Sequence, residues 1–167
     1  MVIIISFDIY TRREDCPAWI THEMVEIGVI TPRNNETIID TEGYAMVAYW
    51  YVGVKTPMEF GNVECFYAGE KTNEVDLGFR VLEHVLNHCN EELNLKRIVL
   101  KCNVSKVVFM MIDEMPVKAG YIKVVKRSWG YIKDNNMDVK FVWSSKRNCN
   151  RRIHMGLYEP DRYNLYW

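Results

Sequence analysis

The spacing of apolar residues along this chain first changes near residue 73, and this change restricts the possible folds more than any other feature. Before it, apolar and aromatic side chains alternate or run together over short segments bounded by turn residues, which predicts β-strands. After it, they recur every three or four residues from Val75 to Leu93, which predicts an amphipathic helix. The predicted strands are residues 2–10, 23–31, 44–53, 63–68, 97–102 and 138–143.

The order of these elements indicates an α/β fold. Hairpin-joined strands come first and β-α-β units follow, because a short helix capped by Ser105 and a basic helix over 119–134 are also predicted. On the basic helix we expect Ile122 and Trp129 to face inward, and Trp143 to lie in the core. We therefore expect a mixed β-sheet, with antiparallel N-terminal strands and then parallel strands, and with helices on its faces.

Length and composition restrict the class of protein. A chain of 167 residues, 49% of them hydrophobic, fits one domain with a sizeable core. No apolar run approaches the roughly 20 residues that cross a bilayer, and the apolar start of the chain lacks the basic segment of a signal peptide. The five cysteines are odd in number and form no C-x-x-C pair, so we expect reduced thiols in a cytoplasmic protein without a membrane partner.

The net charge of -1 conceals an uneven distribution along the chain. Residues 1–100 hold 16 acidic against 8 basic side chains, whereas residues 118–152 hold ten basic against two acidic ones. Such an asymmetry predicts a positive face that suits a phosphate backbone, while a solvated basic helix that binds nothing is the alternative. The candidate nucleic-acid-binding residues in this basic run are Lys123, Lys126, Arg127, Lys146 and Arg147.

Other kinds of catalytic or metal site have little support in the sequence. His84 and His88 lie four residues apart on the predicted helix, close to Glu91, but catalytic zinc needs three protein ligands at defined spacing. A solvated helix face is the better explanation of this pair. The sequence contains no G-x-S-x-G elbow, no Walker motif and no dinucleotide-binding glycine pattern.

Three segments, in the same order as the predicted elements, give the chain a resemblance to type 1 ribonuclease H. Residues 71–77 (KTNEVDL) resemble the T-N-N-x-x-E-L segment that opens the family's first helix. Residues 97–103 (RIVLKCN) are similar to the family's strand that ends in T-D-S. Residues 138–150 resemble its last strand and the loop that follows. The resemblance covers about residues 1–155 and leaves 156–167 as an aromatic tail.

The resemblance implies that strands 2–10 and 97–102 are parallel neighbours and that an acidic site lies at their ends. The family holds two Mg²⁺ ions with four carboxylates. Asp8 matches the first of these carboxylates, and Asp76 matches the helix glutamate, one methylene shorter. Asn103 stands where the family has its second aspartate, and residues 150–154 offer no carboxylate for the fourth. Asn73 matches an asparagine that lines the family's hybrid-binding groove.

Two carboxylates balance only half of the four positive charges of two Mg²⁺ ions. Two functions are therefore possible. The first is Mg²⁺-dependent cleavage of the RNA strand in RNA–DNA hybrids, which would need other acids such as Asp40, Glu74, Asp113 or Glu114 to complete the site. The second is a catalytically silent member of the fold, serving as a binding or inhibitory module for a protein or a nucleic acid. Asp76 also has a structural explanation, because an acid three residues after the cap Asn73 completes a capping box.

Overall fold

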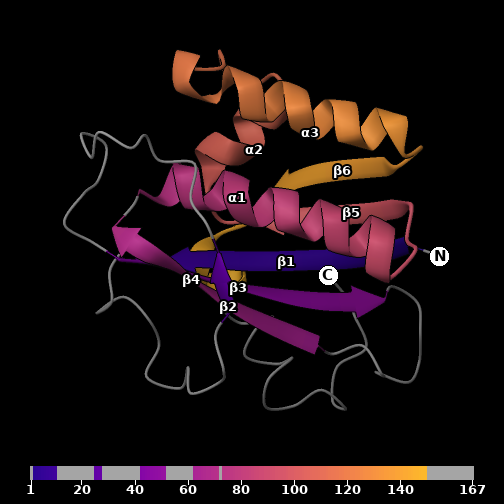
Figure 1. Cartoon of the computed structure of the whole chain (residues 1–167), viewed down its shortest axis with the longest axis horizontal. Helices are drawn as coiled ribbons and strands as arrows, with labels where there is room; N and C mark the ends of the chain where they lie inside the picture. The colour runs from indigo at the N-terminus through magenta and orange to yellow at the C-terminus, as the bar shows by residue number, and fades with distance from the viewer. Residues whose placement is uncertain (1, 11–24, 28–41, 52–61, 72, 150–167) are drawn as a thin grey trace.

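One mixed sheet forms the centre of the molecule (Figure 1). The computed structural model describes residues 2–10, 25–27, 42–51, 62–71 and 73–149. Within these residues six strands are hydrogen-bonded in the order β2-β4-β3-β1-β5-β6. Their bounds are β1 Val2–Tyr10, β2 Val25–Ile27, β3 Glu42–Tyr51, β4 Asn62–Lys71, β5 Arg97–Cys102 and β6 Asp138–Trp143.

The strand directions confirm the expected mixed sheet. β1 is antiparallel to β3, and β3 is antiparallel to the next strand in sequence, β4. β1 is parallel to β5, and β5 is parallel to β6, so the predicted parallel pairing of strands 2–10 and 97–102 is correct. β2 adds a parallel edge strand beside β4. The proposed division into residues 1–155 and a tail at 156–167 ends outside the described residues.

Helix α1 (Glu74–Asn87) makes the crossover from the antiparallel strands to β5, and it packs on β1 and β3. Its apolar stripe, including Leu77, Phe79 and Leu82, is fully buried against the sheet. The last turns continue as a π-helix, η3 (His88–Glu92), so the predicted helix over 75–93 is correct in extent but not regular throughout.

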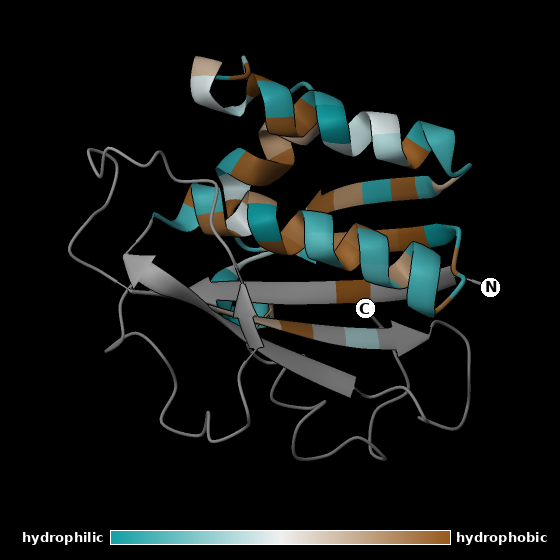
Figure 2. Ribbon diagram, in the orientation of Figure 1, coloured by the Kyte–Doolittle hydropathy of each residue, from teal (hydrophilic) through white to brown (hydrophobic). Residues whose placement is uncertain are grey.

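The remaining helices lie between β5 and β6. They are α2 (Ser105–Met111), the 3-10 helix η4 (Ala119–Tyr121) and α3 (Ile122–Asp134). Figure 1 shows α2 and α3 above α1, and both helices contact α1, so the described helices share one side of the sheet. Figure 2 shows the apolar stripe of each helix beside polar residues of the same helix. No helix in the described part of the chain is long and apolar enough to cross a bilayer.

Four side-chain predictions for this region are wrong. Ile122 and Trp129 were expected to face inward but are 40% and 39% exposed, and Trp143 is 49% exposed. The indole of Trp129 lies at the rim of the core, where its N–H donates to the Met111 carbonyl. Trp143 ends β6, the outermost strand on this side of the sheet, where few elements can cover it. Ser105 is the first residue of α2 rather than its cap, a position held by Val104.

Candidate functional site

The carboxyl ends of β1 and β5 bring Asp8 and Asn103 to the same edge of the sheet. The last parallel pair between the two strands joins Phe7 to Cys102, and Asp8 and Asn103 are the next residue of each strand's chain. Carboxyl ends of parallel strands are a common place for functional side chains. The backbone therefore places these two predicted site residues together, while the side chain of Asp8 lies outside the described part of the structure.

Asp76 reaches this region from the first turn of α1. Figure 1 shows the amino end of α1 on the same side of the molecule as the arrowhead of β1. Asn73 caps the helix: its Oδ1 accepts the Asp76 N–H at 2.9 Å, and its Nδ2 donates to Asp76 Oδ2 at 2.9 Å. The Asp76 residue is only 6% exposed. The predicted cap Asn73 is confirmed, and the buried Asp76 carboxylate accepts from the side chain of this cap rather than from its main chain.

Tyr121 lies beside this group and was not among the predicted site residues. It ends η4, 45 residues after Asp76 in the sequence. Its ring stacks on Phe79 of α1, with centroids 5.3 Å apart. Burial raises the pKa of Tyr121 well above its ordinary value, and the neighbouring Asp76 carboxylate adds to this rise.

The Tyr121 hydroxyl is therefore expected to stay protonated at pH values where other tyrosines ionise. Because its folded-state pKa lies above the ordinary 10.0, its contribution to stability is complete below that pH and is lost as the pH rises further. Asp76→Asn should lower the pKa part of the way, since burial remains. Ring Cζ chemical shifts followed by NMR to high pH would measure this, and a Tyr121 that titrates at an ordinary pH in the parent would contradict its burial beside Asp76.

Additional carboxylates do not gather around Asp76 within the described residues. No three His, Cys, Asp or Glu side chains in this part of the chain are arranged to hold a metal ion. Of the acids that could complete a site, Glu74, Asp113 and Glu114 are exposed, and Asp40 lies outside the described residues, as do residues 150–154. Among the predicted site residues, the backbone register places Asp8 and Asn103 at one end of the sheet, and Asp76 opens the helix whose amino end lies on that side of the molecule.

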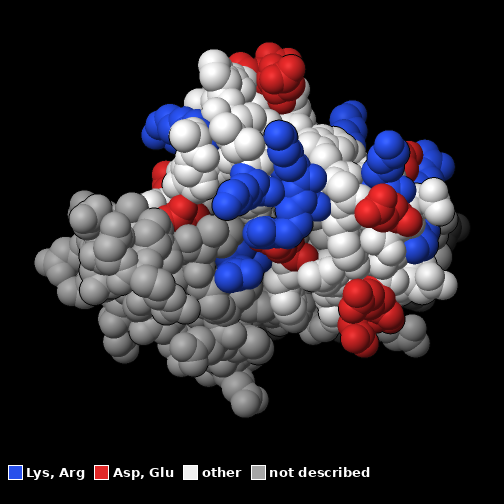
Figure 3. All heavy atoms as spheres, turned by 45° about the horizontal axis from the view of Figure 1, so that its top comes forward, with Lys and Arg blue, Asp and Glu red and all other residues white. Residues whose placement is uncertain are grey.

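A basic face runs along the outer side of α3. Lys123, Lys126, Arg127 and Lys133 are exposed and recur at spacings of three, four and seven residues, whereas Val124, Val125, Ser128 and Ile132 face the interior. Figure 3 shows Lys and Arg side chains gathered on the side of the molecule that α3 lines. Lys146 and Arg147 begin a helical turn capped by Ser145, whose Oγ accepts the Asn148 N–H at 3.2 Å.

Arg127 differs from Lys123 and Lys126 because it already has an anionic partner. Its Nε and Nη2 atoms donate to the two carboxylate oxygens of Glu83 on α1, at 2.9 and 2.7 Å. This contact raises the pKa of the guanidinium. Arginine binds phosphate groups with the same bidentate geometry. Arg127 would therefore have to exchange Glu83 for a phosphate in order to contact nucleic acid, as predicted.

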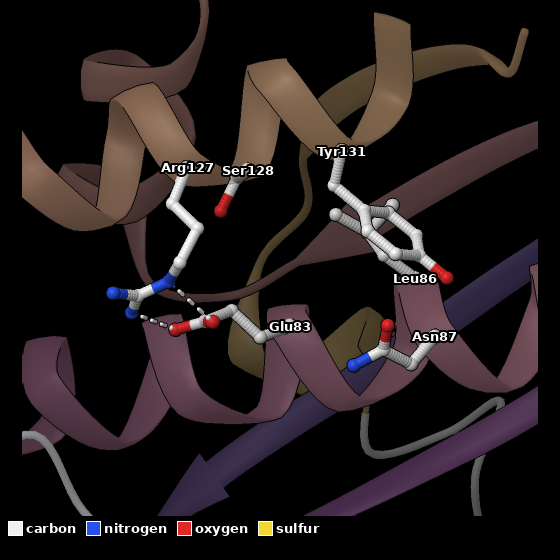
Figure 4. Close-up of a pocket in the computed structure, with 6 residues that line it drawn as sticks. All are labelled: Glu83, Leu86, Asn87, Arg127, Ser128 and Tyr131. Atoms are coloured by element: carbon white, nitrogen blue, oxygen red, sulfur yellow. Dashed lines mark hydrogen bonds and ion pairs between the residues drawn. The ribbon is translucent and has the colours of Figure 1, made fainter. Parts of the chain in front are cut away.

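A pocket of about 150 Å³ lies beside this ion pair, between α1 and α3 (Figure 4). Leu86 forms an apolar part of its wall, and Asn87 and Tyr131 contribute polar groups. Ser128 also lines the pocket; it is 2% exposed, and its Oγ has no protein hydrogen-bond partner. A site of this size and polarity suits ordered water between the helices.

His84 and His88 lie on a different part of α1 and η3 from the acidic group. Their rings are nearly parallel, with centroids 6.0 Å apart, and they line a shallow hollow with Asn87, Glu91 and Glu92. The edge of the Tyr49 ring also packs against His88. These contacts describe two stacked side chains on a helix face, and in the described residues they do not form part of a three-ligand metal site.

Comparison with solved structures identifies the fold. The N-terminal RNase H domain of a Mycobacterium tuberculosis protein matches with a TM-score of 0.60 at 13% identity, covering 90% of this chain and 92% of that one. RNase H1 of the archaeon Halobacterium salinarum matches at 0.57 and 9% identity, covering 90% and 91%. LC11-RNase H1, solved with an RNA/DNA hybrid, matches at 0.54 and 18%, covering 89% of each chain.

These matches show a ribonuclease H-like fold, as the sequence resemblance implied. No protein-family model matches the chain, and no curated protein does so. At identities below 20% the similarity extends to the architecture and not to the chemistry of the site.

Proposed function

We propose, from its ribonuclease H-like fold, that this chain binds a nucleic-acid duplex, with the RNA–DNA hybrid as its preferred form. The observation that carries the proposal is the exposure of Lys123 and Lys126 on one face of α3, opposite the buried face of that helix. Rows of lysine and arginine on one face bind phosphates and release counterions from the duplex. Lys146 and Arg147 extend the same charge toward the carboxyl end of the sheet, and Asn73 would contact the hybrid there.

We also propose that the carboxyl end of β1 binds a single Mg²⁺ ion through Asp8 and Asp76. Mg²⁺ is commonly held by one or two carboxylates together with water and substrate phosphate. The donors fit one such ion, because two carboxylates balance its charge and Asn103 can add a carbonyl oxygen. They do not fit a pair of ions, whose four positive charges would be only half balanced. When bound, Mg²⁺ would neutralise a phosphate of the nucleic acid at this end.

Two chemical outcomes follow from this site. A catalytically silent binding module is favoured by Asn103, since the position of the family's second aspartate carries no charge here. Cleavage of the RNA strand is the second candidate, and Asp76 favours it, because a buried carboxylate held by the Asn73 side chain is preorganised for a role beyond capping.

A gel assay with a labelled RNA–DNA hybrid, with and without Mg²⁺ or Mn²⁺, tests the proposal and separates the two outcomes. We expect a retarded hybrid band that the metal strengthens. An intact RNA strand in that band identifies the silent module, and metal-dependent shortening of the RNA identifies the nuclease. A hybrid that migrates unretarded at low salt, even at high protein concentration, would contradict both.

Glu83→Gln is expected to strengthen hybrid binding. The change releases Arg127 from its bidentate partner, so the guanidinium can contact a phosphate. We expect a gain of about threefold in affinity and a salt dependence steeper by about one unit of slope. Glu92→Gln on η3 removes the same charge at an exposed position and serves as the control. Equal affinities of both variants, measured by fluorescence anisotropy, would show that Glu83 does not compete with the nucleic acid.

A further inference from the structure

We propose that the pocket between α1 and α3 binds one unpaired pyrimidine base. This inference goes beyond the proposed duplex binding, because a base within a duplex is already paired and stacked. The pocket has a volume of about 150 Å³, and three residues of each helix line it (Figure 4). A cavity of about this volume holds a single six-membered ring such as benzene. The space therefore fits one ring and is too small for the two fused rings of a purine.

Two contacts between the helices bracket this pocket and hold its shape. On one side, Arg127 donates to both carboxylate oxygens of Glu83, at 2.9 and 2.7 Å. On the other side, the Tyr131 hydroxyl accepts from Asn90 Nδ2 at 3.0 Å, and this contact joins α3 to η3. Arg127, Glu83 and Tyr131 are themselves part of the pocket wall. The pocket is therefore formed before a ligand arrives, which lowers the cost of binding one.

The Ser128 hydroxyl is the first polar group available to a ligand. The residue is buried, yet its Oγ has no hydrogen-bond partner among the described residues. Figure 4 shows this oxygen directed from α3 toward the space between the helices. A buried hydroxyl without a partner costs free energy, so a molecule that bonds to it relieves that cost. A hydroxyl can donate to a carbonyl of a base or accept from a ring N–H.

Asn87 supplies a second polar group, from the α1 wall of the pocket. The residue is exposed, and its side-chain amide has no hydrogen-bond partner among the described residues. An amide presents a donor and an acceptor side by side, which complements the donor and acceptor groups on the edge of a base. Leu86 and the Tyr131 ring supply apolar surface for the faces of that base, and aromatic side chains commonly stack on bases.

The charges around the pocket favour a neutral ligand. Its two charged residues, Arg127 and Glu83, neutralise each other in their ion pair. An anion would be repelled by Glu83, and a cation by Arg127. A purely apolar ring would leave the polar groups of Ser128 and Asn87 without partners. A pyrimidine base is flat, uncharged near neutral pH and polar at its edge, so it meets each of these requirements.

NMR titration of the isotope-labelled full chain with uridine tests the inference. Uridine carries no phosphate, so the result does not depend on the basic face of α3 or on duplex binding. We expect saturable shifts at Leu86, Asn87 and Ser128 with a Kd of about 1 mM, as suits one small ring, and at least about tenfold weaker binding of adenosine. Uridine 5′-monophosphate and a single-stranded oligouridylate are titrated in parallel. The tighter of these two identifies a free nucleotide or a nucleic acid as the source of the base.

Ser128→Ala removes the hydroxyl and keeps the helix, because Ala is the best helix former. We expect about fivefold weaker uridine binding, the effect of one hydrogen bond, and no loss of stability to urea. Asn148→Ala, at an exposed position outside the pocket, is the control and should bind uridine like the parent. Absence of saturable uridine binding up to about 20 mM, as for a pocket that holds water only, would overturn the inference. So would equal binding of adenosine, or an unchanged uridine affinity in Ser128→Ala.

Discussion

Replacing Lys123 and Lys126 together by Glu is expected to weaken binding of an RNA–DNA hybrid by at least about 30-fold, roughly 2 kcal/mol. Both side chains are exposed on α3 and lie three residues apart, on adjacent turns of one face. Each reversal removes a phosphate contact and adds a repelling charge, so the salt dependence should also lose about two units of slope. Fluorescence anisotropy at several salt concentrations measures both effects.

Arg127 is left unchanged in this test, because Glu at that position would face Glu83 and threaten the packing of α3 on α1. Lys140→Glu is the control. Phe141 packs against Trp129 of α3, so the neighbouring Lys140 side chain leaves the strand on the opposite face of the sheet. Lys140→Glu should weaken binding far less than Lys123→Glu alone. Similar losses for the two single variants would show that binding responds to total charge and not to the α3 face.

Asn103→Asp is expected to raise Mg²⁺ affinity at least about tenfold, roughly 1.4 kcal/mol. Asn103 follows the end of β5, beside the position of Asp8, so the change places a third anion at the proposed metal site. An opposite charge a few ångströms from a divalent ion contributes several kcal/mol even after generous screening. Calorimetry or metal-dependent thermal shift measures the change, and Asp8→Asn should abolish the binding that the parent shows.

Asn136→Asp adds the same charge at the other end of the sheet, before β6 begins, and should leave Mg²⁺ affinity unchanged. If Asn103→Asp behaves like this control and merely lowers stability, position 103 does not face a metal site. Asp8 and Asp76 would then keep only structural roles, and the chain would be a binding module without a cation.

The architecture could be predicted well from the sequence, because the spacing of apolar residues and the order of the predicted elements carry most of the information about it. The change from strand to helix spacing placed α1, and the apolar segments 2–10 and 97–102 proved to be parallel neighbours. The cap Asn73 was predictable because a capping box is a local pattern of four residues. Errors occurred where tertiary position decides exposure, as for Trp129 at the rim of the core and Trp143 on an outer strand.

The site was predictable only in part, because its decisive contacts join distant residues. Nothing local indicates that Tyr121 lies beside Asp76, or that Glu83 pairs with Arg127 across 44 residues. A count of basic residues treats Lys123 and Arg127 alike. The Lys123 side chain is exposed, whereas Arg127 is already paired with Glu83. That an uncharged residue, Asn103, follows β5 could, in contrast, be predicted from the order of the strands and the family resemblance alone.

Titration of a labelled RNA–DNA hybrid with the unmodified chain, at salt concentrations from about 50 to 200 mM, tests nucleic-acid binding most directly. We predict saturable binding whose logarithm falls linearly with the logarithm of salt, with a slope of about −3 for the contacts of α3 and the turn after β6. Absence of saturable binding at the lowest salt, or an affinity that does not change with salt, would contradict the assignment of this ribonuclease H-like fold to nucleic-acid binding.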